Sequence, residues 1–246
     1  MMHTNPKIFL YAVLFAQSLI PYVTAAAPAA TGGLITLAVL NAAVPAANST
    51  SSCSNLPAED KWPSECVDNT VAVVSINKAL SKYSISRRAD VVAILSWMAY
   101  ESGSWKNYQT HYPSTIPGQG TRCMMSWTFV SDYAKELYPD KYATAIGQHA
   151  CNATEATDAE KDNVLALVTN NDDAFAAGFW FLVNQSGDYY TNKTLVDGDY
   201  DSFLTFNNEV LYVGTDPALV AARKVVWDTV NATITLDMIK NPRDSI

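Results

Sequence analysis

The stretch RRADVVAILSWMAYES, residues 87–102, decides the fold class of this chain. Apolar residues recur along it at helical spacing, and its two acids stand near its ends, at Asp90 and Glu101. Ser86 holds the position of an N-cap, and Asp90 falls in the first turn, where a carboxylate complements the positive end of the helix dipole. We therefore expect a helix over residues 87–102.

Helical patterns also dominate the rest of the chain. They predict helices over residues 67–83, 127–137, 158–169, 172–184, 199–208 and 216–235. Pro139 is expected to end the helix at 127–137, and Asp216 followed by Pro217 is typical of a helix start. Strand patterns are weak, and no repeat or linker divides the chain after Cys53. The sequence predicts one mainly α domain over residues 53–246.

Residues 1–27 have the pattern of a secretory signal peptide. Lys7 precedes a charge-free apolar run at 8–20, Pro21 breaks it, and three alanines at 25–27 suit cleavage. The alternative is an uncleaved anchor, because residues 8–27 are long enough to span a bilayer. The small-residue site favours cleavage and a secreted, extracellular protein. Residues 28–52 are then expected to form either a flexible arm or a propeptide.

Export makes the four cysteines candidates for disulfides. Three pairings are possible, and the most local one joins Cys53 to Cys66 and Cys123 to Cys151, so we expect a domain stapled by two disulfides. Acceptor triplets for N-linked glycans predict a glycoprotein. They begin at Asn48, Asn152, Asn184, Asn192 and Asn231.

Charge and composition exclude several function classes. The 16 Lys and Arg against 24 Asp and Glu give a net charge of −8, and no basic run offers a nucleic-acid surface. The second apolar stretch, residues 34–44, is too short to span a membrane. We therefore expect no stable membrane association of the mature protein. The chain has few histidines and no His-Glu-x-x-His motif, so we expect no metal site and no cofactor. It has no Gly-x-Ser-x-Gly motif, so we expect no serine nucleophile. We expect a monomer.

Glu101 is the strongest candidate for a catalytic residue. Helical spacing places it on one face with Ile94, Trp97 and Met98. A carboxylate at the end of an apolar stripe, near the negative end of a helix dipole, is disfavoured in its charged form. The protonated form is the one that a general acid requires. The alternative is that Glu101 only marks where the helix meets solvent.

Two motifs then carry a resemblance to a known family. The segments ESGSW at 101–105 and GQGTRCMMS at 118–126, with His111 between them, resemble the lysozyme-like superfamily of goose-type lysozymes and lytic transglycosylases. Of these, the chain resembles secreted fungal lysozyme-like proteins more closely, over roughly residues 66–227. The resemblance implies a lysozyme-like domain with a sugar cleft.

The resemblance also implies the function and the site. Glu101 would be the general acid of a secreted muramidase that cleaves β-1,4 bonds of peptidoglycan, with chitin-type polymers as secondary substrates. Ser102 would orient Glu101 through a hydrogen bond. The substrate-binding residues would be Gly118, Gln119, Gly120, Arg122, Met124 and Met125.

Some features depart from the family pattern. Met125 stands where the family has a glutamine, and Cys123 stands where it has an asparagine. A glycosidase normally needs a second carboxylate, for which Asp199 and Asp201 are candidates, although both would also suit a solvated acidic loop. The alternative function is therefore a catalytically silent, secreted relative that binds sugar or interacts with a host.

Overall fold

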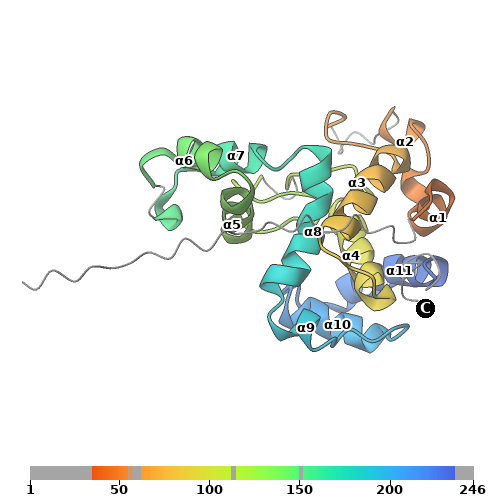
Figure 1. The fold of residues 1–246 in the computed structure, drawn as a ribbon. Helices are drawn as coiled ribbons and strands as arrows, with labels where there is room; N and C mark the ends of the chain where they lie inside the picture. The colour runs from red at the N-terminus through yellow and green to blue at the C-terminus, as the bar shows by residue number, and fades with distance from the viewer. Residues whose placement is uncertain (1–34, 55, 57–61, 112–114, 150–151, 236–246) are drawn as a thin grey trace, which may run out of the picture.

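The computed structural model describes residues 35–54, 56, 62–111, 115–149 and 152–235 (Figure 1). Within these ranges the chain is mainly helical, as predicted, and no strand forms. The helices are α1 (Leu37–Ala43), α2 (Ser51–Ser54), α3 (Asn69–Lys82), α4 (Arg88–Glu101), α5 (Trp127–Leu137), α6 (Pro139–Ile146), α7 (Asp158–Ala166), α8 (Asn171–Gln185), α9 (Asp188–Thr191), α10 (Tyr200–Glu209) and α11 (Pro217–Thr233).

The predicted helices all form, with small differences at their ends. Ser86 does not cap α4, because Arg87 takes that place and no side chain caps the helix. The sequence missed α6, which begins at the proline expected only to end α5. Pro139 does both, since proline cannot continue one helix but suits the first turn of the next.

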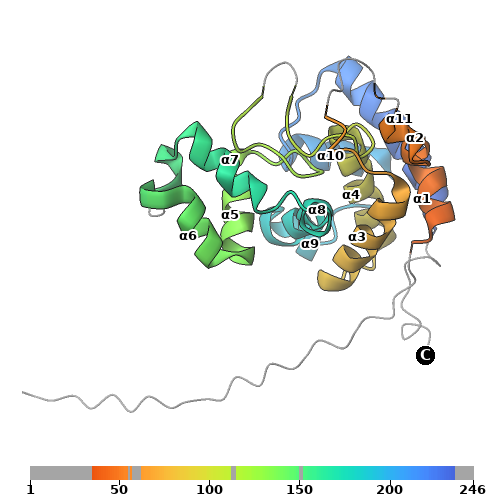
Figure 2. The same cartoon turned by 90° about the horizontal axis from the view of Figure 1, so that it is seen from above.

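Helix α8 lies between two groups of helices. Figures 1 and 2 show α5, α6 and α7 on one side of it and α3, α4 and α11 on the other. Gly178 allows α8 to approach α4 closely, because a Cβ there would lie 3.0 Å from Met98 Sδ and 3.1 Å from Ile94 Cγ2. The small residue therefore brings the two central helices together.

Helix α4 is buried on every side rather than along one stripe. All of its residues from Ala89 to Ala99 are buried, because α8 and α11 both pack against it. The predicted apolar face of Ile94, Trp97 and Met98 is thus part of a fully enclosed helix. Its partly exposed residues stand at its two ends, Arg88 at the start and Tyr100 and Glu101 at the end.

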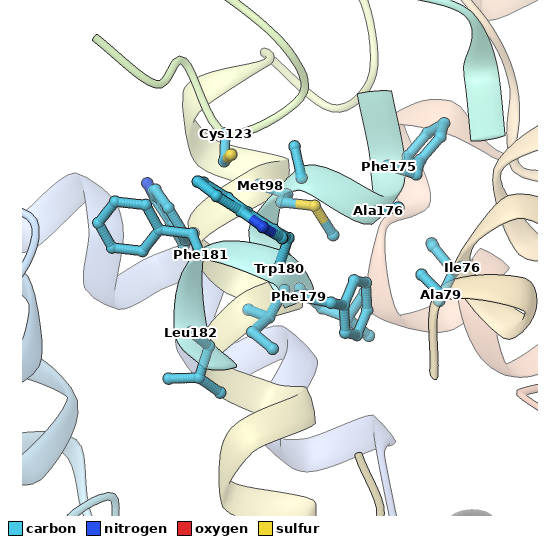
Figure 3. Packing of buried hydrophobic residues seen from close by; sticks show 14 of the residues in the cluster. Ile76, Ala79, Met98, Cys123, Phe175, Ala176, Phe179, Trp180, Phe181 and Leu182 are labelled. Carbon is cyan, nitrogen blue, oxygen red and sulfur yellow. The ribbon is translucent and has the colours of Figure 1, made fainter. Parts of the chain in front are cut away.

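Aromatic side chains of α8 form the centre of the core. Figure 3 shows Phe175, Phe179, Trp180 and Phe181 in this cluster, with Cys123 at its edge. Phe181 packs edge-on against Trp97 of α4, with ring centroids 5.2 Å apart. These contacts hold α4, and therefore the position of its last turn, against α8.

The segment predicted as a flexible arm or propeptide packs against the domain over its described part. Ile35, Leu40 and Val44 are buried, and α1 packs on α3 and α11. Asn69 Nδ2 donates to the backbone oxygens of Leu40 and Val44, and Asn77 bonds both the backbone N–H and C=O of Ile35. From residue 35 onward the segment is therefore not a loose arm, and its removal as a propeptide stays a prediction.

The prediction of two disulfides is wrong, because the described residues hold one disulfide and Cys123 is a free cysteine. Cys53 and Cys66 are bonded as predicted. Cys123 is a free thiol that is buried in the core, where it lies 3.3 Å from Thr121 Oγ1. Its side chain therefore belongs to the packing of the interior (Figure 3). Its predicted partner Cys151 and the predicted signal peptide, residues 1–27, lie outside the described residues.

Candidate functional site

A cleft of about 840 Å³ opens where the end of α4 meets two loops. Its polar wall includes Glu101, the 107–111 segment and Gln119, and Arg223 of α11 faces the same space. The apolar lining residues are Trp62, Trp97, Ile116, Cys123, Met124, Met125, Phe129, Phe181, Val210, Leu211, Tyr212 and Val213. This is the size of cavity that binds a ligand of several rings.

Glu101 stands at the cleft because the chain reverses immediately after it. Gly103, Ser104 and Trp105 all have left-handed backbone conformations, with φ between 60° and 69°. Buried Trp105 then anchors the turn, since its Nε1 donates to Asn69 Oδ1 at 2.8 Å. The motif after Glu101 therefore ends α4 sharply and leaves its last side chain at the wall.

Ser102 shapes this turn and does not orient Glu101. Its Oγ donates to the Met98 backbone oxygen at 2.7 Å and accepts from the Trp105 backbone N–H at 3.0 Å. The side chain is fully buried and does not line the cleft. The predicted hydrogen bond to Glu101 is wrong, because the turn itself uses the hydroxyl.

Glu101 has a charged partner that the sequence did not predict. Arg223 Nη2 donates to Glu101 Oε1 at 2.6 Å, and the two side chains are 10% and 21% exposed. The guanidinium also lies over the Tyr100 ring, 4.2 Å from its centroid. A guanidinium stabilises the ionised form of a carboxylate. The apolar surroundings expected for Glu101 are therefore replaced by an ion pair.

The glycines of the predicted sugar loop pack inward. A Cβ on Gly120 would lie 2.4 Å from the Tyr108 backbone oxygen, and one on Gly118 would lie 2.6 Å from the Trp127 ring. The Gly118 N–H donates to Asp162 Oδ1 of α7 at 3.0 Å. These two glycines fix the loop and do not line the cleft, whereas Gln119, Met124 and Met125 do.

Arg122 is a structural residue and not a sugar contact. It is fully buried, and its guanidinium donates to the backbone oxygens of Trp105 at 2.9 Å and Glu65 at 2.8 Å. Desolvation lowers the pKa of Arg122 to about 10. Its predicted place at the cleft is wrong, because these bonds tie the loop to the turn after α4.

The candidates for a second acid lie elsewhere. Asp199 caps α10 by accepting from the Asp201 backbone N–H at 3.0 Å, and both residues are exposed outside the cleft. Among the described residues that line the cleft, Glu101 is the one carboxylate. Asp199 and Asp201 are therefore solvent-exposed acids, as the alternative interpretation predicted.

The structure places a pair beside the cleft that sequence analysis missed. His111 Nε2 lies 2.8 Å from Glu65 Oε1, and the Trp62 ring stacks on the imidazole with centroids 3.4 Å apart. Trp62 and His111 both line the cleft. Glu65 and His111 are 46 residues apart in the sequence, so local patterns do not reveal the pair, and only His111 carried a signal, through its place in the family motif.

Other sequence expectations concern metals and glycans. No group of three or more His, Cys, Asp or Glu side chains is placed to hold a metal within the described ranges. Asn48, Asn152, Asn184 and Asn192 are exposed, as a glycan acceptor must be. Asn231 lies within α11, and its Oδ1 is buried. None of the described helices is long and apolar enough to span a bilayer.

Comparisons with known proteins give little further guidance. No family model matches the chain, and no solved structure matches it. A curated relative from Fusarium oxysporum, described as a bifunctional dioxygenase–epoxy alcohol synthase, is 30% identical over 155 residues. The match covers 62% of this chain but only 11% of the relative. The chain thus matches about a ninth of that protein's length. The activity in the relative's description is that of the full-length relative.

Proposed function

We propose that this protein is a secreted glycoside hydrolase of the muramidase type, which cleaves β-1,4 bonds of peptidoglycan with Glu101 as general acid. The observation that supports it is the position of Glu101, whose partly exposed carboxylate stands in the wall of a large cleft. Residues of the sequence motifs at 101–105 and 118–126 form or support this wall. The resemblance to lysozyme-like proteins supplies the substrate class.

The ion pair with Arg223 sets a condition on the mechanism. A general acid must carry a proton before it can give one to the glycosidic oxygen, and a guanidinium stabilises the carboxylate without that proton. We therefore expect the rate of cleavage to be highest in acidic medium. The net charge of −8 suits such a medium, because protonated carboxylates repel one another less.

A second candidate is a catalytically silent protein that binds sugar in the same cleft. The ion pair on Glu101 supports it, since a paired carboxylate is a poor proton donor. Met125 supports it as well, because this apolar residue lines the cleft at the place of the family's glutamine. Under this proposal the cleft would bind peptidoglycan or a chitin-type polymer without cutting it.

The test is the loss of turbidity of bacterial cell walls between pH 3 and 7. Glu101→Gln is expected to lower the rate about 100-fold or more, the range for removing a general acid. Asp228→Asn is the matched control, since this exposed residue of α11 pairs with Lys224 and does not line the cleft. It is expected to act like wild type.

Other outcomes decide between the two candidates. Equal rates for wild type and Glu101→Gln would remove Glu101 from the mechanism. Binding to cell walls without hydrolysis, unchanged by Glu101→Gln, would favour the silent protein over the enzyme.

A further inference from the structure

His111 presents one ring nitrogen to the protein and leaves the other unused. Its Nε2 is bonded to Glu65 Oε1 at 2.8 Å, and both side chains are nearly enclosed, at 10% and 6% exposure. Within the described part of the chain, Nδ1 has no hydrogen-bond partner. Because His111 lines the cleft, a ligand or water bound there can contact its imidazole ring.

Hydrogen bonds fix the Glu65 carboxylate beside His111. Its Oε2 accepts from the backbone N–H groups of Tyr108 at 3.0 Å and Gln109 at 3.3 Å. Its backbone oxygen accepts from buried Arg122. A carboxylate fixed by two N–H donors stays an acceptor, so it keeps the imidazole proton on Nε2 and leaves the lone pair on Nδ1.

Trp62 fixes the plane of the imidazole. The two rings are parallel to within 4°, with centroids 3.4 Å apart. A tryptophan face also stabilises a cation that stacks on it. The positive charge that forms when His111 takes up a proton would therefore be stabilised by both Glu65 and the indole ring.

We propose that His111 is the general base of this cleft and that Glu65 positions it. This inference rests on the proposed function, because it concerns the water that replaces the leaving sugar. His111 would supply the second proton-transfer group that Asp199 and Asp201 do not. Inverting glycosidases place such a base so that it activates water on the face opposite the bond that breaks.

The step balances as follows. The water oxygen forms a bond to the anomeric carbon, and one of its protons goes to His111 Nδ1. The glycosidic C–O bond breaks with its electron pair on the leaving oxygen, which takes the proton of Glu101. Once the products leave, His111 returns its proton to solvent and Glu101 takes one up. The product therefore has the inverted configuration at the anomeric carbon.

Several charged groups surround this base and affect its pH dependence. Glu65 faces the imidazole directly, and Arg122 and Tyr108 lie against Glu65. Glu101 and Arg223 line the same cleft as His111. A rate that depends on neutral His111 should fall at low pH, whereas a rate that depends on protonated Glu101 should fall at high pH.

The experiment follows hydrolysis of a soluble peptidoglycan fragment by proton NMR and by pH-dependent kinetics. Wild type is expected to release an inverted product. His111→Gln, which can still bond Glu65, is expected to lower kcat about 100-fold with little change in KM. It should also lose the low-pH limb of the profile, and added azide should restore turnover as a glycosyl azide.

Glu65→Gln tests the positioning role. It is expected to reduce kcat less than His111→Gln with little change in KM, because the imidazole stays in the cleft but loses the acceptor that fixes its tautomer. Circular dichroism and cell-wall binding equal to those of wild type establish that both variants fold. A merely structural His111 would leave the pH profile unchanged and give no azide rescue.

The two proposals fail in different ways. A retained product, a product closed by the sugar's own hydroxyl, or an unchanged pH profile in His111→Gln would overturn the role of His111 while the glycosidase stands. Absence of hydrolysis by wild type would overturn the proposed function, and the general base with it.

Discussion

The two acidic residues of α4 lie at opposite ends of one helix and in opposite surroundings. Asp90 is 1% exposed, and neither of its carboxylate oxygens has a hydrogen-bond partner in the described part of the chain. Arg87 Nη1 lies 3.2 Å from Oδ1 but is not directed to donate to it. Burial, opposed only partly by Arg87 and Lys193, raises the pKa of Asp90 to about 6. Glu101, in contrast, stands at the open cleft and pairs with Arg223.

The sequence predicts Asp90 in the first turn of a helix, where the structure places it, and a sheltered carboxyl at Glu101, which the structure instead places at the open cleft. Arg87 donates to the backbone oxygens of Lys193 and Leu195, so the chain after α9 covers the beginning of α4. A helix that is buried all round shows no exposed face in its sequence, and the elements at its two ends decide which acid reaches water.

The largest stability effect expected is that of Asp90→Asn. Because the folded protein raises the pKa of Asp90 from 3.8 to about 6, its stabilising contribution is fully present below pH 3.8 and is lost as the pH rises through 6. A shift of this size is worth about 3 kcal/mol. The variant, which stays uncharged, should gain about that amount over wild type between pH 3 and 7.

Urea unfolding at pH 3, 5 and 7 measures this difference. Asp228→Asn serves as the control, because this aspartate is exposed and pairs with Lys224 at the surface. A constant offset between Asp90→Asn and wild type at all three pH values would show that Asp90 is not the titrating group.

Arg223→Met is expected to have the next largest effect. It removes the ion pair with Glu101 and the stacking on Tyr100, both in a partly buried setting between α4 and α11. We expect a loss of about 2 kcal/mol in the free energy of unfolding. The control Lys224→Met breaks an exposed pair with Asp228 and should cost about 0.5 kcal/mol or less. Equal losses would mean that the cleft pair does not join the two helices.

Glu160→Gln is expected to have the smallest effect, with a pH dependence opposite to that of Asp90. Hydrogen bonds from Thr157, with His149 adding to them, lower the pKa of Glu160 to about 2. Its contribution is therefore present above pH 4.5 and is lost as the pH falls through 2. Thermal unfolding should show a lower Tm for the variant at pH 6 and equal values near pH 2. If the Tm difference persisted at pH 2, the effect would come from the hydrogen-bond geometry of the Thr157–Glu160 capping box and not from the charge of Glu160.

The helical part of the fold could be predicted because it depends on neighbours in the chain. The bounds of α5 are those predicted from periodicity, and Asp216 caps α11 as expected. The packing of residues 35–47 was missed, since α1 is short and is held by side chains of α3 such as Asn69 and Asn77. A short helix has little signal of its own, and its stability comes from tertiary contacts.

For the site, the sequence alone located the end of α4, the glutamate at that end and the loop whose Gln119, Met124 and Met125 line the same cleft. Only the tertiary structure decided what each side chain does there. Arg223 reaches Glu101 across 122 positions, Glu65 reaches His111 across 46, and burial keeps Arg122 out of the cleft. Local spacing sets which residues share a turn of helix, but charge pairing and exposure depend on segments that meet only in the folded chain.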